Sequence, residues 1–242
     1  MTISQIRDGF RAEHHAMLFA WIAKETISQV GRNEASPVLH KAVRRYGEQR
    51  GRRMALRAQA NGHDLSMLTW LAYPEWKPVK NEMVMKLVQR RPDVRIHIPL
   101  CPWYTNWKDN GLLEYGTFYC EEIDKAVVRG FNTDLLIDVN SIKPHGHGVC
   151  DMVFHDVDLT PLAMFKFLTR KFIAARKNSI MPWEYHIGHL YKTIGEELMY
   201  AFGEKGRIAC LNAINIFSKK YGQDATQVVR RYWDTDFDQL AA

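Results

Sequence analysis

Between residues 81 and 157, parts of the chain change from the spacing of apolar residues that is typical of a helix to the spacing that is typical of a strand. Apolar residues alternate with polar ones at Met83, Met85 and Leu87, and again at Val94, Ile96 and Ile98. This two-residue period is typical of strands with one buried face. The stretches that favour β-structure are NEMVMKLVQ (81–89), DVRIHIPLC (93–101), DLLIDVNSI (134–142) and GVCDMVFHDV (148–157). Since RRP separates the first two, we expect a hairpin there.

Helical patterns lie on both sides of this central part, and one lies within it. They cover residues 3–30, 37–60, 115–131, 160–177, 184–202, 206–221 and 224–236, with a short apolar piece at 65–73. We therefore predict an α+β fold, with a central four-stranded, mostly antiparallel sheet and the N- and C-terminal helices on one of its faces. We expect a single domain over residues 1–242, made of N-terminal helices (1–75), the sheet (76–158) and C-terminal helices (159–242).

Several classes of protein are excluded by simple features. No apolar run approaches the ~18–20 residues that span a bilayer, so we expect no membrane partner. The N-terminal residues MTISQIRDGFRAEHH lack the apolar region of a secretory signal. Four cysteines in a chain of this length, without an export signal, indicate reduced thiols and a cytoplasmic location.

Much of the basic character comes from one helix. The net charge is +6, and residues 44–57 read RRYGEQRGRRMALR. Such a helix could grip an anion, but a solvated helix face is the simpler interpretation. No nucleic-acid-binding motif accompanies it, so the sequence does not favour nucleic acid as a partner.

The stretch KPHGHGVCD (143–151) joins the last two predicted strands. Three interpretations are open. The first is a metal site that uses His145 or His147 together with cysteines. The second is a cysteine–histidine pair for nucleophilic catalysis. The third is a tight turn whose histidines face water. The flanking strands favour the turn, and no C-x-x-C pair supports a local metal site.

Three cysteines lie where the predicted secondary structure changes. Cys101 ends a strand, Cys120 lies early in a helix, and Cys150 opens a strand. Ends of strands often meet at one edge of a sheet, where sites are commonly built. Cys120 and Asp124 are four residues apart, so they share a helix face. A thiol near a helix N-terminus has a lowered pKa, although a small buried Cys120 is the simpler interpretation.

The remaining histidines are weaker candidates. His14 and His15 include one residue on the buried face of a helix, and His186 and His189 are three residues apart on another. We interpret these as core or pocket-wall residues, and His155 as a residue at a strand end.

This central block resembles the L-2-amino-thiazoline-4-carboxylic acid hydrolase-like family. The resemblance rests on Cys101-Pro102, on YCEEID with Cys120 and Asp124, on GFNTDLLIDV, and on GHGVCD with Gly146, Cys150 and Asp151. It covers about residues 80–156. Met152 stands where the family pattern has an aromatic residue, and HGHG is particular to this chain.

The resemblance implies a hydrolase that opens a small cyclic C–N substrate, such as an amidine, an isothiourea or a lactam-like ring. In the family's namesake reaction, water adds to the ring carbon between sulfur and nitrogen, and an N-carbamoyl amino acid results. A thiolate- or metal-assisted reaction would draw on Cys120, Asp124, His147 and Cys150 as catalytic residues. Substrate contacts would come from His145, Asp151, Cys101 and Tyr119, with an arginine of residues 44–57 pairing with a substrate carboxylate.

Partners and cofactors follow from the same reading. We expect a carboxylate-bearing small molecule as the partner, and an assembly of identical copies is left open. The sequence does not identify a cofactor. If a metal is bound, zinc suits the cysteine and histidine residues best. The alternative is a small-ligand sensor that holds zinc or iron through Cys101, Cys120, Cys150 and His147. We also expect His147 and Cys150 to face the helix of Cys120 and Asp124, with His145 the more dispensable histidine.

Overall fold

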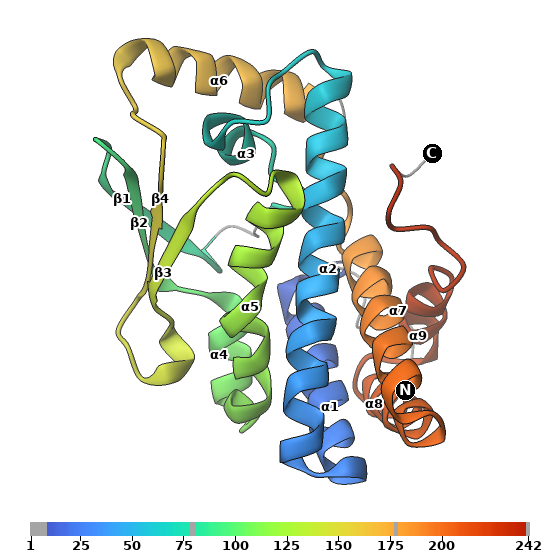
Figure 1. The fold of residues 1–242 in the computed structure, drawn as a ribbon. Helices are drawn as coiled ribbons and strands as arrows, with labels where there is room; N and C mark the ends of the chain where they lie inside the picture. The colour runs from blue at the N-terminus through green and yellow to red at the C-terminus, as the bar shows by residue number, and fades with distance from the viewer. Residues whose placement is uncertain (1–8, 78–80, 177–178, 241–242) are drawn as a thin grey trace. The chain divides into compact units, whose positions relative to one another are not determined.

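The computed structural model describes residues 9–77, 81–176 and 179–240 (Figure 1). The change from helical to strand-like patterns in the sequence corresponds to a change from helices to strands in this structure. In chain order the elements are α1 (Ala12–Val30), α2 (Arg32–Ala60), α3 (Met67–Ala72), β1 (Val84–Gln89), β2 (Val94–Leu100), α4 (Pro102–Asp109), α5 (Leu113–Phe131), β3 (Ile137–Ser141), the 3-10 helix η2 (Lys143–His145), β4 (Cys150–Phe154), α6 (Pro161–Arg176), α7 (Trp183–Phe202), α8 (Glu204–Tyr221) and α9 (Gln223–Arg230).

The chain divides into two units, each assembled from three segments. The first comprises Met1–Tyr46, Pro102–Glu121 and Pro182–Thr235, and its described part is helical. The second comprises Gly47–Cys101, Glu122–Met181 and Asp236–Ala242, and it contains the sheet. Helices α2 and α5 each contribute their first part to the first unit and their second part to the other.

In the core of the first unit, buried Trp, His and Tyr side chains form hydrogen bonds with one another and with the backbone. The indole of Trp103 donates to Nδ1 of His15 at 3.1 Å, so His15 Nε2 carries the hydrogen that faces the Tyr46 hydroxyl at 2.9 Å. Trp107 donates to the carbonyl oxygen of Ala16 at 2.8 Å. A Cβ at Gly116 would lie 2.0 Å from the Trp107 ring. His14 and His15 are buried, as predicted for core histidines.

The second unit contains the predicted sheet. Within the described residues the sheet has four antiparallel strands in the order β1-β2-β4-β3. The β1–β2 hairpin is confirmed, and Ile98 pairs with Cys150 across β2 and β4. Cys150, Met152 and Phe154 alternate along β4 and are buried. The α+β class predicted from the sequence is therefore confirmed.

Glycines let α2 approach α5 closely in this unit. A Cβ at Gly51 would lie 2.1 Å from the carbonyl oxygen of Val127, and one at Gly130 would lie 2.2 Å from that of Glu48. Side chains at these positions would force the two backbones apart. The second part of α2 is thus held against the second part of α5, which carries Asp124.

Two helix starts differ clearly from the prediction, and one helix was not predicted. α1 begins at Ala12 rather than at residue 3, and residues 3–8 of that predicted helix lie outside the described residues. α2 begins at Arg32, before Pro37, because the Ala35 N–H donates to the Gly31 carbonyl at 3.0 Å and closes a turn ahead of the proline. α4 was not predicted, although Pro102 occupies the first helical position that proline favours.

The basic segment of α2 is only partly a solvated face, because Arg50, Arg53 and Arg57 are buried while Arg52 is exposed; this corrects the simpler interpretation of the sequence. Glu75 is 1% exposed and Arg53 is 0% exposed. Arg53 contacts the two carboxylate oxygens of Glu75 at 2.8 and 3.0 Å, Arg57 contacts it at 2.9 Å, and Arg50 at 3.4 Å. Arg53 also donates to the Phe237 carbonyl at 2.6 Å. The sequence could not show this because Glu75 lies well after the helix.

At one end of the sheet a histidine lies between two carboxylates. His155 places Nε2 at 2.8 Å from Asp138 and Nδ1 at 3.2 Å from Asp93. Only the protonated ring can donate to both carboxylates. The hydrogen bond to Asp138, followed by that to Asp93, raises the pKa of His155, although burial opposes the shift.

The stability of this sheet end is therefore expected to depend on pH. Because the folded-state pKa of His155 is raised, its contribution is fully present below its ordinary value of about 6.5 and is lost as pH rises through the raised value. We expect His155→Gln to lower Tm at pH 6 more than at pH 9, measured by thermal unfolding. An equal loss at both pH values would mean that the proton on His155 contributes nothing.

No helix in the described part of the chain is both long and apolar enough to cross a membrane.

Candidate active site

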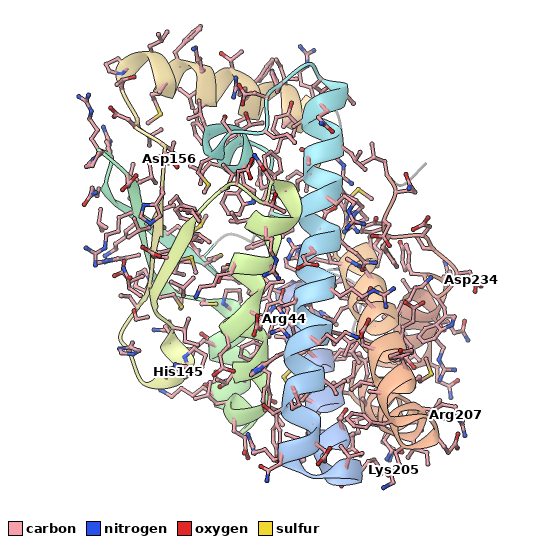
Figure 2. The ribbon with its side chains drawn as sticks, in the orientation of Figure 1. Arg44, His145, Asp156, Lys205, Arg207 and Asp234 are labelled. Atoms are coloured by element: carbon pink, nitrogen blue, oxygen red, sulfur yellow. The ribbon has the colours of Figure 1, made fainter. Side chains whose placement is uncertain are left out.

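The stretch KPHGHGVCD is a turn between two strands, as the flanking patterns favoured. β3 ends at Ser141, η2 covers Lys143–His145, Gly146 takes the left-handed conformation with φ 88°, and β4 starts at Cys150. His145 and His147 are exposed. Figure 2 labels His145 in this connection between β3 and β4. The glycine at 146 is needed because that backbone conformation is costly for other residues.

Lys143 ties this turn to the end of β2. Its Nζ donates to the carbonyl oxygens of Pro99 and Gly148, both at 2.9 Å, and its backbone N–H is directed at Cys150 Sγ at 3.4 Å. The site residues predicted from the sequence did not include Lys143. Its place immediately before the Pro-His-Gly turn is the feature of the sequence that could have identified it.

Cys150 is a buried thiol at this end of the sheet. Cys101 directly follows β2, and Ile98 of β2 pairs with Cys150, so the two cysteines lie at the same sheet end, as predicted. Burial is the main cause that raises the pKa of Cys150; the charge of Asp124 raises it further, while the Lys143 N–H and ammonium oppose. Cys150 is therefore a neutral thiol at pH 7, not a preformed thiolate.

Asp124 has a pKa far above that of an ordinary carboxyl. It lies on α5, retains partial solvent exposure, and has a pKa raised to about 6 by desolvation, with the Arg50 charge opposing. A carboxyl with a pKa near neutrality can both accept and return a proton at physiological pH. Perturbed groups of this kind are enriched at functional sites.

Asp151 has a different environment from its neighbour Cys150. Successive residues in a strand point to opposite faces of the sheet. Arg95 holds Asp151 with two contacts of 2.7 and 2.5 Å, and His97 and Asn140 each approach it at 3.3 Å. Arg95 lowers the pKa of Asp151, so this carboxylate stays charged. Its partners identify it as a cross-strand ion pair on the other sheet face.

Cys120 and Tyr119 belong to the first unit. Cys120 is the eighth residue of α5, which begins at Leu113. The influence of a helix N-terminus falls off within the first turn, so the predicted lowering of the Cys120 pKa by the helix end has no basis. Tyr119 is buried; its ring lies 6.4 Å from that of Trp103 in a stacked arrangement and 5.4 Å from that of His15.

The histidines of α7 form part of the same helical core. His186 and His189 are buried, and the His189 ring lies 4.4 Å from that of Tyr46. This agrees with our interpretation of both as packing residues. Cys210 is buried in α8, and desolvation raises its pKa to about 12, so it remains a thiol.

The predicted site residues thus fall into two groups. The second unit holds Asp124 and Arg50 together with Cys101, Cys150 and the turn of His145 and His147, and it carries Asp151 on the other sheet face. The first unit holds Tyr119 and Cys120. The prediction that His147 and Cys150 both face α5 stays a prediction for His147, while the charge of Asp124 acts on Cys150.

Metal binding gains no support from the described residues. Over residues 9–77, 81–176 and 179–240, no three or more His, Cys, Asp or Glu side chains are grouped so that they could hold a metal ion. The sensor alternative, which needs Cys101, Cys120, Cys150 and His147 in one site, therefore has no observation in its favour.

A comparison with protein families identifies a match. The model of the family described as L-2-amino-thiazoline-4-carboxylic acid hydrolase matches residues 10–154, which is more than half of the 242 residues. The match is longer than the stretch of about residues 80–156 that carries the resemblance, and it extends through α1 and α2. No curated protein and no solved structure matches the chain.

Proposed function

The chain belongs to the L-2-amino-thiazoline-4-carboxylic acid hydrolase family, and from this premise we propose that it hydrolyses a small cyclic amidine or isothiourea that carries a carboxylate. The observation that carries the proposal is the acidity of Asp124, with a pKa of about 6 beside the charge of Arg50. Ring opening of such a substrate needs a base for the attacking water, an acid for the leaving atom and an anchor for the carboxylate.

Asp124 is proposed to move the proton. As carboxylate it accepts a proton from water while the water oxygen bonds to the ring carbon between the two heteroatoms. As carboxylic acid it then gives this proton to the ring sulfur or nitrogen when the bond from that atom to the carbon breaks. With the namesake substrate the sum is addition of one water and release of an N-carbamoyl amino acid with a free thiol.

Arg50 is the proposed anchor. Its charge acts on Asp124, and its Nε lies 3.4 Å from Glu75. A planar guanidinium is suited to pair with a carboxylate through two hydrogen bonds. A substrate with an amidinium and a carboxylate matches the opposite charges of Asp124 and Arg50.

Cys150 is proposed to line the site rather than to attack. Its raised pKa leaves the thiol protonated at neutral pH, so a covalent route would first require Asp124 to take its proton. The roles implied by the resemblance for His147, as a proton carrier, and for Cys120, as the alternative nucleophile, belong to the thiolate route and not to this water route.

The assay is release of thiol from L-2-amino-thiazoline-4-carboxylate, with the N-carbamoyl product identified by mass spectrometry. For the water route we expect Cys150→Ser and Cys120→Ser to keep kcat within about ten-fold of the parent, since neither removes the proton carrier. A loss of more than about a thousand-fold in one of them, with a trapped covalent adduct, would establish a thiolate route instead. No ring opening with this substrate or with a panel of cyclic amidines would contradict the proposed function.

A further inference from the structure

Helix α6 presents an apolar face to solvent. Four large side chains spaced three, three and four residues apart lie on one side of it, and each is more than half exposed: Leu162 (64%), Phe165 (68%), Leu168 (56%) and Phe172 (60%). This spacing places them in one stripe along the helix. Single exposed apolar residues are common on protein surfaces, but a continuous stripe of this kind marks an interaction surface.

The opposite side of α6 is fixed to its own unit, so the stripe is held outward. Arg170 forms two contacts with the carboxylate of Asp64, at 2.7 and 3.0 Å, and it also bonds Thr69. Asp64 in turn accepts from the Ser66 N–H at the start of α3 at 3.1 Å. Figure 1 shows α6 beside α3 within this unit. Turning the helix inward would break these charged contacts.

Positive charge borders the stripe. Lys166, Lys171 and Arg176 are exposed, and α6 has no Asp or Glu between Pro161 and Arg176. The Arg176 guanidinium lies 5.2 Å from the ring of Phe172, and the Lys171 ammonium lies 5.5 Å from that of Phe167. An apolar stripe of Phe and Leu edged by cations is the pattern of helices that lie in the plane of a membrane interface.

We propose that α6 docks on an anionic lipid surface, with its Phe and Leu side chains among the acyl chains and its cations at the headgroups. This surface is separate from the proposed catalytic residues and does not depend on them. A second copy of the chain is the less suitable occupant, because a two-fold contact would bring Lys166, Lys171 and Arg176 of one copy against those of the other. The helix would lie on the membrane without crossing it. The expectation of no membrane partner rested only on spanning segments, and it did not consider this mode.

The test is co-sedimentation of the full chain with phosphatidylcholine vesicles, with and without phosphatidylglycerol. We expect binding to the anionic vesicles that weakens as salt rises. Phe165→Ser with Phe172→Ser should weaken the partition by about 100-fold, because two apolar side chains no longer enter the interface. Lys166→Glu with Lys171→Glu should weaken it by about 30-fold or more.

The matched control is Met85→Ser with Val88→Ser on β1, whose side chains are 57% and 48% exposed. These changes remove exposed apolar surface elsewhere, so we expect binding to stay as in the parent. Vesicle binding that is lost equally in the control, or that is as strong on phosphatidylcholine alone, overturns the proposal. So does absence of binding at low salt. A dimer in solution that the Phe165→Ser, Phe172→Ser variant abolishes would assign the stripe to a second copy instead.

Discussion

Glu75→Gln is expected to lower the free energy of unfolding by about 3–5 kcal/mol, the largest effect on stability that we predict. The carboxylate of Glu75 receives contacts from Arg50, Arg53 and Arg57, and both it and Arg53 are almost fully removed from solvent. Glutamine keeps the size but removes the negative charge, which leaves buried guanidinium groups without their counterion. Urea unfolding at pH 7, followed by circular dichroism, measures the difference.

The control for this substitution is Glu48→Gln on α2, the helix that carries the three arginines of the Glu75 cluster. Glu48 accepts from Arg129 at 2.8 Å, but the side chains are 36% and 48% exposed. Exposed pairs of this kind contribute about 0–1 kcal/mol, so we expect a change below about 1 kcal/mol. Equal losses in Glu75→Gln and Glu48→Gln would show that burial does not make the Glu75 cluster special.

A double replacement separates charge from packing in the same cluster. Glu75→Gln combined with Arg53→Met removes one carboxylate and one of its arginines, so fewer buried charges remain uncompensated. Buried ion pairs are often replaced by apolar residues at little cost. We therefore expect the double variant to be more stable than Glu75→Gln alone, although it also loses the contact of Arg53 with the Phe237 carbonyl.

The parts of the fold that were predictable are those encoded locally. The alternation at 81–101 and the turn residues at 143–148 predicted β1, β2 and the connection before β4, because both signals lie within a few residues of the structure that they produce. The helix starts at Arg32 and Ala12 were missed because other local signals, such as Pro37, pointed elsewhere.

The site was less predictable, since its acidity depends on distant residues. Asp124 was a candidate only because it lies four positions from Cys120. Burial within the second unit raises its pKa, and the charge of Arg50, which is 74 positions earlier in the chain, limits the rise. The prediction of a solvated face on α2 was incomplete for the same reason. Whether Arg53 faces water depends on its contact with Glu75, which the helical periodicity of the sequence does not reveal.

Asp124→Asn is expected to lower kcat by about 100- to 10,000-fold, because the amide can neither accept nor return the proton of the attacking water. In the parent, activity should rise with pH around 6, since the carboxylate is the active form of the base and its pKa is about 6. The residual activity of the variant should lack this rise. Thiol release from L-2-amino-thiazoline-4-carboxylate between pH 5 and 8, with separate kcat and KM values, measures both effects. The matched control is Asp134→Asn, whose side chain is exposed near the end of α5 and should leave the pH profile unchanged.

The same substitution should make the protein more stable at neutral pH, which distinguishes a proton carrier from a structural residue. The folded-state pKa of Asp124 lies above its ordinary value of about 3.9, so the folded protein binds more protons than the unfolded chain between pH 4 and 6. Stability is lost as pH rises through this window, and the full penalty remains at pH 7. Asparagine carries no charge and removes the penalty, so Asp124→Asn should gain about 1–3 kcal/mol at pH 7 and little at pH 4. An inactive variant that is also less stable at pH 7 would instead indicate that Asp124 supports the fold, and the proposed base would have to be sought elsewhere.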